Sequence, residues 1–139
     1  MILSSATHTL NLTTSSTSEV DVTVSYLDIT SSSLTPAAQD SQIVTATTTQ
    51  ICDAPAASTQ RQIKVITVIN TGTASNSITI VKTTSGVFTL YKTVLQAGQS
   101  ATYSPDGGWK KFDSNGTPIS EPANKVGIQT GYSTFYTKS

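Results

Sequence analysis

The feature that most constrains the fold of this chain is the alternation of apolar side chains with serine and threonine. Ser and Thr together make up 46 of the 139 residues. In residues 20–25 and 77–81, every second side chain is Val or Ile, and the residues between them are mostly small and polar. A period of two places neighbouring side chains on opposite faces of a β-strand, so that one face is buried and the other is wet. The alternation therefore predicts an all-β protein.

The chain has the size of one domain, and we expect an antiparallel β-sandwich or jelly roll of seven to nine short strands, without a helix. Strands are predicted at residues 9–12, 20–29, 43–52, 62–70, 77–82, 87–95, 100–103 and 109–112. Residues 62–70 are almost continuously apolar, which is typical of a central strand covered on both faces. A change of phase at Tyr26 and Leu27 predicts a bulge or a strand end. Residues 30–42 are expected to form a polar loop.

The composition changes after residue 117 and predicts two segments. Residues 1–117 are expected to form the β-sandwich with an N-terminal strand or arm, and residues 118–139 a C-terminal tail. Pro118 interrupts strand pairing at the start of this tail. The tail contains three aromatic side chains, Tyr132, Phe135 and Tyr136. Because aromatic surface with little charge is unfavourable in water, we expect the tail to dock on the domain or on a partner.

Charge is scarce and unevenly distributed along the chain. Charged residues make up 12% of the sequence and the formal net charge is zero, which argues against a nucleic-acid binder that neutralises phosphates. Residues 1–60 carry a net charge of −5, and residues 61–139 carry +5. The two halves are expected to attract each other within the chain or between copies. A chance imbalance on a solvated surface, which contributes little energy, is an equally good interpretation.

Uncharged strands create a risk at the edges of a sheet. Edges are normally protected by Lys, Pro or bulges, because unprotected edges pair with other chains. We therefore expect the edges of this protein to be covered in an oligomer.

Few residues of the chain have the chemistry of a catalytic or metal site. His8 is the only histidine and Cys52 the only cysteine, so that neither a Ser/His/Asp triad nor a closed zinc shell is predicted. Cys52 is expected to be a small core residue. Eight carboxylates leave a glycosidase open in principle, but none of them lies in a distinctive context. The chain is therefore expected to be non-enzymatic and to use no cofactor and no metal.

Trp109 has two interpretations. Beside a Gly-rich turn, its ring could stack on a sugar or insert into the pocket of a partner. Alternatively, Trp109 and Phe112 flank two lysines at the start of a short strand, where the indole would seal the end of the core. The structural role is favoured, and the role in partner contact is kept beside it.

Two further absences concern the location of the chain. The N-terminal residues lack the basic and long apolar segments of a signal peptide, and no apolar run is long enough to span a membrane. We therefore expect the protein to be made and assembled in a cytoplasm, without a membrane partner.

Four segments form a pattern of strand and turn residues. They are residues 24–30 (VSYLDIT), 54–64 (APAASTQRQIK), 91–103 (YKTVLQAGQSATY) and 107–116 (GGWKKFDSNG). This pattern, which ends in Gly-Trp-x-x-x-Asp-x-Asn-Gly, resembles a group of small tailed-bacteriophage virion proteins. The likeness covers about residues 10–117 and does not include the C-terminal tail.

The resemblance implies a structural β-domain of a phage particle, assembled in the cytoplasm of the host bacterium and without enzymatic activity. The leading expectation is a protein that decorates or cements the capsid as a homotrimer, in contact with itself and with the major capsid protein. The alternative is a component of the tail, baseplate or fibre that binds a host-surface glycan. The side chains expected to make partner contacts are Trp109, Tyr132, Phe135 and Tyr136. No direct contact with nucleic acid is expected.

Overall fold

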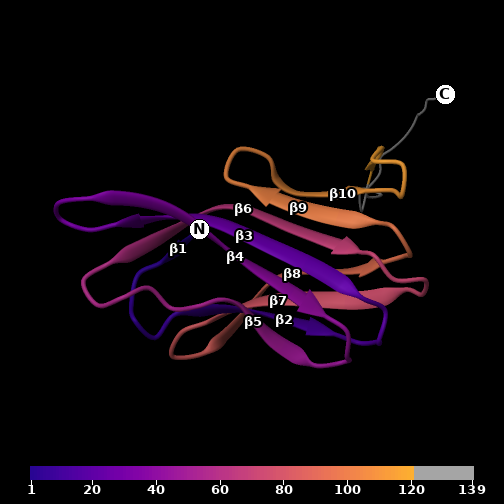
Figure 1. Ribbon diagram of the computed structural model, residues 1–139, viewed down its shortest axis with the longest axis horizontal. Coiled ribbons are helices and arrows are strands. Elements are labelled where there is room, and N and C mark those ends of the chain that lie inside the picture. Colours follow the sequence, from indigo (N-terminus) through magenta and orange to yellow (C-terminus); the bar gives the residue numbers. More distant parts are fainter. Residues whose placement is uncertain (121–139) are drawn as a thin grey trace, which may run out of the picture.

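A computed structural model describes residues 1–120, which contain eleven β-strands and no helix (Figure 1). The strands are β1 (Ile2–Leu3), β2 (Thr9–Thr14), β3 (Val20–Ile29), β4 (Leu34–Ile43), β5 (Thr48–Cys52), β6 (Gln60–Asn70), β7 (Asn76–Thr83), β8 (Val87–Leu95), β9 (Ser100–Ser104), β10 (Gly108–Phe112) and β11 (Pro118–Ile119). Two of them, β1 and β11, have only two residues and leave no periodic signal in the sequence.

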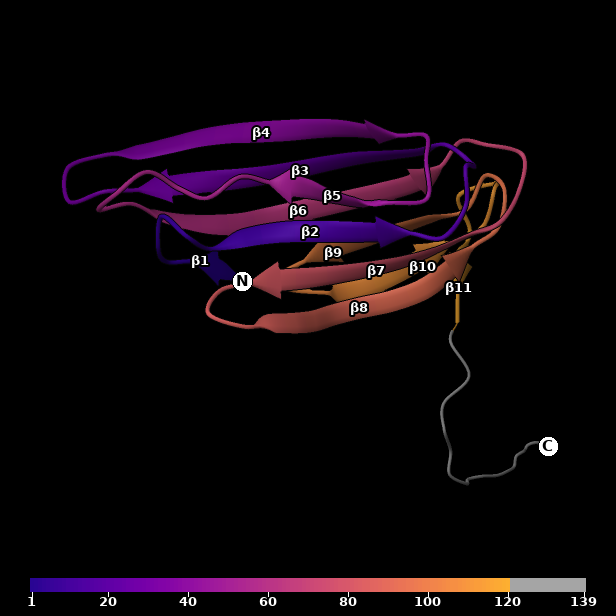
Figure 2. The same cartoon turned by 90° about the horizontal axis from the view of Figure 1, so that it is seen from below.

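The strands form two antiparallel sheets. The larger sheet has the order β11-β10-β9-β6-β3-β4, with β1 paired to β6, and the smaller sheet has the order β5-β2-β7-β8. Figure 2 shows the smaller sheet lying across one face of the larger sheet. Within β2–β9, only β3–β4 and β7–β8 are consecutive strands paired in one sheet, and the other connections cross between the sheets. The predicted all-β antiparallel sandwich is thus confirmed, and its crossing connections are typical of a jelly roll.

The core lies between the two sheets and consists of the residues that the alternation placed on one face. Its fully buried side chains include Leu10 and Leu12 of β2, Val20 and Val24 of β3, Ile63, Ile66 and Val68 of β6, and Ile78 and Ile80 of β7. Cys52 is also part of this core, as expected.

The prediction of a polar loop at residues 30–42 is wrong. Residues Leu34–Ile43 form β4, which pairs with β3 over ten residues at the edge of the larger sheet. Most of its side chains are exposed, so neither face of β4 shows an apolar period. Pro36 favours a loop, but proline is tolerated in an edge strand. The strand expected at residues 43–52 is accordingly divided, because Ile43 ends β4 and β5 begins at Thr48.

Strand β6 is central, but it is not covered equally on its two faces. Its pairing with β3 shifts register: Ser25 lies opposite Val65, Tyr26 lies opposite Ile63, and Lys64 is left as the extra residue of a bulge. Beyond the bulge the alternation of β6 is reversed, so that Val65 is exposed while Ile66 is buried. The continuous apolar run therefore reflects a change of phase. The shift lies within one residue of the phase change expected at Tyr26, with the extra residue on the neighbouring strand.

The end of the sandwich at which β6 stops is closed by neutral amides. Asn70 is fully buried, and its Oδ1 accepts hydrogen bonds from Ser18 Oγ at 2.8 Å and from Gly72 N at 3.0 Å. Its Nδ2 donates to the carbonyl oxygens of Ala74 at 2.8 Å and Leu95 at 2.9 Å. The Asn70 side chain therefore ties turns of both sheets together.

The larger sheet continues past residue 117, where the sandwich was expected to end. Pro118 and Ile119 form β11 and pair with Phe112 and Lys111 of β10. The rest of the expected tail, residues 121–139, lies outside the described residues.

Candidate functional site

Trp109 of β10 lies where one side of the sandwich is closed by aromatic rings. Its indole stacks on Tyr91 of β8, with ring centroids 4.3 Å apart and ring planes inclined by 2°. Its cross-strand neighbour Tyr103 of β9 lies 5.3 Å away at an interplanar angle of 49°. Because β8 belongs to the smaller sheet and β9 and β10 to the larger, the stack joins the two sheets. All three rings pack against the core.

Polar contacts complete this closure. Lys111 donates from Nζ to the carbonyl oxygen of Val94 on β8 at 2.7 Å. The N-terminal ammonium of Met1 donates to Tyr103 Oη at 3.5 Å. The side of the sandwich between β8 and β10 is therefore held by a ring stack with a lysine beside it.

A groove of about 410 Å³ opens next to the rings. It is lined by Tyr91, Trp109, Lys110, Lys111, Phe112, Pro118 and Ile119. Because Tyr91 stacks on the indole, one face of Trp109 is already occupied within the chain. The groove therefore offers a mixed wall of rings, aliphatic side chains and two ammonium groups.

The last two of the four segments of the phage-like pattern, residues 91–103 and 107–116, form one continuous unit from β8 to the turn after β10. Gly98, Gly108 and Gly116 have φ angles of 82°, 65° and 82°, which L side chains rarely adopt. Asp113 accepts hydrogen bonds at Oδ1 from two backbone N–H groups of the last turn, both at 2.9 Å. Three aromatic residues of these two segments are the rings of the stack, Tyr91, Tyr103 and Trp109.

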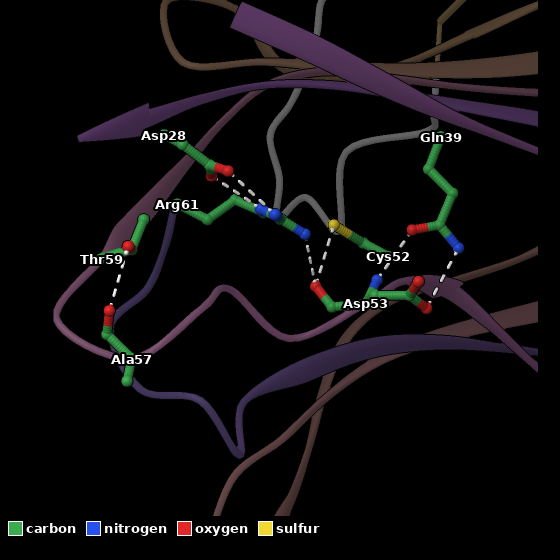
Figure 3. A network of polar contacts seen from close by, with 7 residues as sticks. All are labelled: Asp28, Gln39, Cys52, Asp53, Ala57, Thr59 and Arg61. Atoms are coloured by element: carbon green, nitrogen blue, oxygen red, sulfur yellow. Dashed lines mark hydrogen bonds and ion pairs between the residues drawn. The ribbon is translucent and has the colours of Figure 1, made fainter. Parts of the chain in front are cut away.

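A second cluster, which was not predicted from the sequence, is centred on Arg61 of β6 (Figure 3). Arg61 is only 8% exposed. Its Nε and Nη2 donate to the two carboxylate oxygens of Asp28 at 2.8 and 2.9 Å, and its Nη1 donates to the Asp53 carbonyl oxygen at 2.8 Å. The ring of Tyr26 lies 3.9 Å from the guanidinium carbon. A guanidinium with this many partners has the geometry of a structural clamp.

The Arg61 cluster also connects the sheets. Asp53 follows β5, and its backbone N–H donates to Gln39 Oε1 of β4 at 2.8 Å. The hydrogen bonds of Asp28 are the main cause that raises the pKa of Arg61, so that the guanidinium stays charged. Desolvation by burial raises the pKa of the Cys52 thiol, whose Sγ lies 3.7 Å from the Asp53 carbonyl oxygen.

The strand pattern contained a signal for this cluster. Arg61 has the same parity as the buried Ile63, and Asp28 has the same parity as the buried Val24. Two opposite charges at inward positions of a β-sandwich form an ion pair or remain unpaired in the core, and an unpaired buried charge is strongly unfavourable.

The other residues singled out from the sequence do not converge on one place. His8 is hydrogen-bonded near the N-terminus, where its Nδ1 accepts from Ser4 N at 3.4 Å. Within residues 1–120, no group of three or more His, Cys, Asp or Glu side chains could hold a metal ion. The same part of the chain has no helix that is long and apolar enough to cross a membrane. Three of the expected contact residues, Tyr132, Phe135 and Tyr136, lie outside the described residues, so that their role and that of Trp109 in partner contact stay predictions.

Comparison of the chain with models of protein families, with curated proteins and with solved structures gives no match. The resemblance to phage virion proteins therefore stays a prediction from the four sequence segments.

Proposed function

We propose that this protein is a non-enzymatic structural protein of a tailed-bacteriophage virion, which decorates and cements the capsid. It assembles in the host cytoplasm as a homotrimer and contacts the major capsid protein. The observation that carries the proposal is the β8–β10 unit, in which the conspicuous residues of the last two segments of the phage-like pattern have turn, hydrogen-bonding or stacking roles. A pattern of this kind is that of a rigid building block.

The outer faces of the two sheets support the same function. On the larger sheet, Thr23, Thr67 and Thr102 are paired side by side across β3, β6 and β9. On the smaller sheet, Thr48, Thr13 and Thr79 form a similar row across β5, β2 and β7. Hydroxyl rows of this kind can lie against another protein without the desolvation of charges, which makes them suited to a permanent contact.

The experiment that tests the proposal is cryo-electron microscopy of the particle that carries this protein. We expect density for the sandwich at symmetry-related positions on the outer surface of the capsid. Absence of the protein from the capsid surface would contradict the proposal. A second measurement is the temperature at which particles release their DNA, which should fall when the protein is left out and should recover when the purified chain is added back.

The groove beside Trp109 favours a second candidate function, in which the chain is a tail, baseplate or fibre component that binds a host-surface glycan. Sugar rings pack on aromatic side chains, and the lysines of the groove can donate hydrogen bonds. A glycan array distinguishes the two functions. Glycan binding predicts a signal that Trp109→Ala abolishes and that Phe88→Ala, an exposed ring outside the groove, leaves intact. An array without signal for the unchanged chain would exclude this second function for the glycans tested.

A further inference from the structure

One row of paired residues runs across the whole outer face of the larger sheet and has opposite charges at its two ends. The row is Asp40, Thr23, Thr67, Thr102 and Lys110, on β4, β3, β6, β9 and β10. Asp40 and Lys110 are both exposed. Four steps between neighbouring strands separate them by roughly 19 Å, so they do not pair within one chain.

On each side of the sandwich, one further side chain carries the same charge as the nearer end of this row. On the β4 side, Asp21 lies diagonally across from Asp40, and the two line one shallow hollow. On the other side, Lys92 of β8 ends the threonine row of the smaller sheet through its pairing with Thr79. Lys92 and Lys110 therefore lie along the same edge of the sandwich but belong to its two opposite outer faces. The uneven charge of the sequence thus becomes an acidic flank, Asp21 and Asp40, and a basic flank, Lys92 and Lys110, on opposite sides of the sandwich.

Both flanks contain a strand edge that other strands of the described chain leave open. β4 is the last strand of the larger sheet on the acidic side. On the basic side, β11 pairs with only Phe112 and Lys111, so that residues 108–110 have a neighbouring strand on one side only. Sheet edges without cover are where chains associate.

We propose that the acidic flank of one copy binds the basic flank of the next copy, with Asp40 facing Lys110. The inference names the contact surfaces of the oligomer in the proposed function and rests on that function for its homotrimeric form. Asp106 and Asp113 lie in the turns at the two ends of β10 and lower the net charge of the basic flank. The contact therefore depends on the Asp40–Lys110 pair more than on the total charge.

The strand directions say how such copies are related. Four antiparallel steps separate β4 from β10, so that the two strands run in the same direction. A neighbouring copy can therefore present its β10 flank to β4 with its strands parallel to those of the first copy. This head-to-tail contact is heterologous, and it closes into a ring about an axis along the strands if the rotation per copy permits.

Sedimentation of the purified full-length chain at low and high ionic strength tests this interface. The unchanged chain should sediment as a closed oligomer at low salt and dissociate partly at high salt, because exposed charges are screened. Asp40→Lys and Lys110→Asp each place like charges at the contact and should raise the dissociation constant at least about tenfold. The combined Asp40→Lys/Lys110→Asp variant restores an opposite pair and should associate nearly as well as the unchanged chain.

Lys64→Asp is the matched control, because Lys64 is exposed on the central strand β6, away from both flanks. It should leave the dissociation constant unchanged, and circular dichroism should show the same β signal for all variants. The interface is refuted if the unchanged chain is a monomer at every concentration. It is also refuted if Lys64→Asp weakens association as much as Lys110→Asp, or if the combined variant fails to recover. These results need no virus particle, so that the interface and the virion assignment can fail independently.

Discussion

At one end of the sandwich the charged Arg61, which is paired with Asp28 of its own sheet, joins the two sheets through the Asp53 carbonyl oxygen, whereas at the other end the neutral Asn70 amide joins them. Arg61 is the second residue of β6 and Asn70 is its last, so that the two side chains lie roughly 30 Å apart. Asn70 is fully buried, while the Asp28 carboxylate keeps a side-chain exposure of 24%. Neutral closure tolerates complete burial, and charged closure remains close to water.

The two ends should therefore respond differently to mutation and to solution conditions. Loss of a buried amide leaves several unsatisfied donors and acceptors, which water cannot reach without local unfolding. Loss of a charge near the surface is partly compensated by water and salt.

Substitution of Asn70 by Leu should have the largest effect. It removes four hydrogen bonds, so that the Ser18 O–H loses its acceptor and the Leu95 carbonyl oxygen loses a donor. We expect a loss of about 3 to 4 kcal/mol in the free energy of unfolding. Urea unfolding followed by the fluorescence of the single Trp109 measures it. Asn11→Leu, which removes hydrogen bonds on the outer face of β2, should lose less than about 1 kcal/mol. Equal losses in the two variants would contradict the importance of buried amides.

A methyl group at Gly72 should disturb the same end from the backbone. A Cβ atom there would lie 2.6 Å from the Glu19 amide nitrogen and closer still to Ser18 Oγ, so that the turn must move. We expect Gly72→Ala to lower the free energy of unfolding by about 2 to 3 kcal/mol. Gly86→Ala is the control, because its Cβ would meet only the Phe88 ring at an ordinary 3.5 Å. A harmless Gly72→Ala would show that this end is more adaptable than its hydrogen bonds indicate.

Much of this fold could be predicted from the sequence, because alternation determines which face of a strand is buried. Val20, Val22 and Val24 point into the core as their period requires. The edge strand β4 could not be found in this way, since a strand with both faces exposed has no apolar period. The β6 bulge was also hidden, because its extra residue turns two alternating runs into one continuous apolar run.

The candidate sites were predicted less completely than the fold. The place of Trp109 at the start of a strand predicts that its ring seals the core. Its stacking partner Tyr91 could not be predicted in this way, because Tyr91 lies on the other sheet. The Arg61–Asp28 pair connects residues 33 positions apart. Such contacts depend on strand order, which local periodicity does not determine.

Removal of one partner at the charged end should have an intermediate effect. Arg61→Met leaves the Asp28 carboxylate without its hydrogen-bonded partner in a partly buried place. We expect a loss of about 2 kcal/mol, below the values for fully buried pairs because Asp28 is in contact with water. The combined Asp28→Leu/Arg61→Met variant should recover at least half of this loss, since it removes both charges. A double variant that is no more stable than Arg61→Met would contradict the cost of an unpaired Asp28 carboxylate.

The smallest expected effect is the dependence of stability on alkaline pH through Cys52. Burial raises the pKa of this thiol in the folded chain, so the folded state keeps its proton to higher pH than the unfolded state does. The stability that results is fully present below the pKa of an unfolded thiol, about 8.5, and is lost as the pH rises through the folded pKa. Cys52→Ala should remove this slope while Asn70→Leu keeps it.

Thiol labelling reports on the same end of the sandwich directly. Modification of Cys52 should be faster in Arg61→Met than in the unchanged chain, because Arg61 holds the Asp53 carbonyl beside the Sγ atom. Equal labelling rates would mean that the clamp does not control access to the thiol, and that the charged end opens no more easily without it.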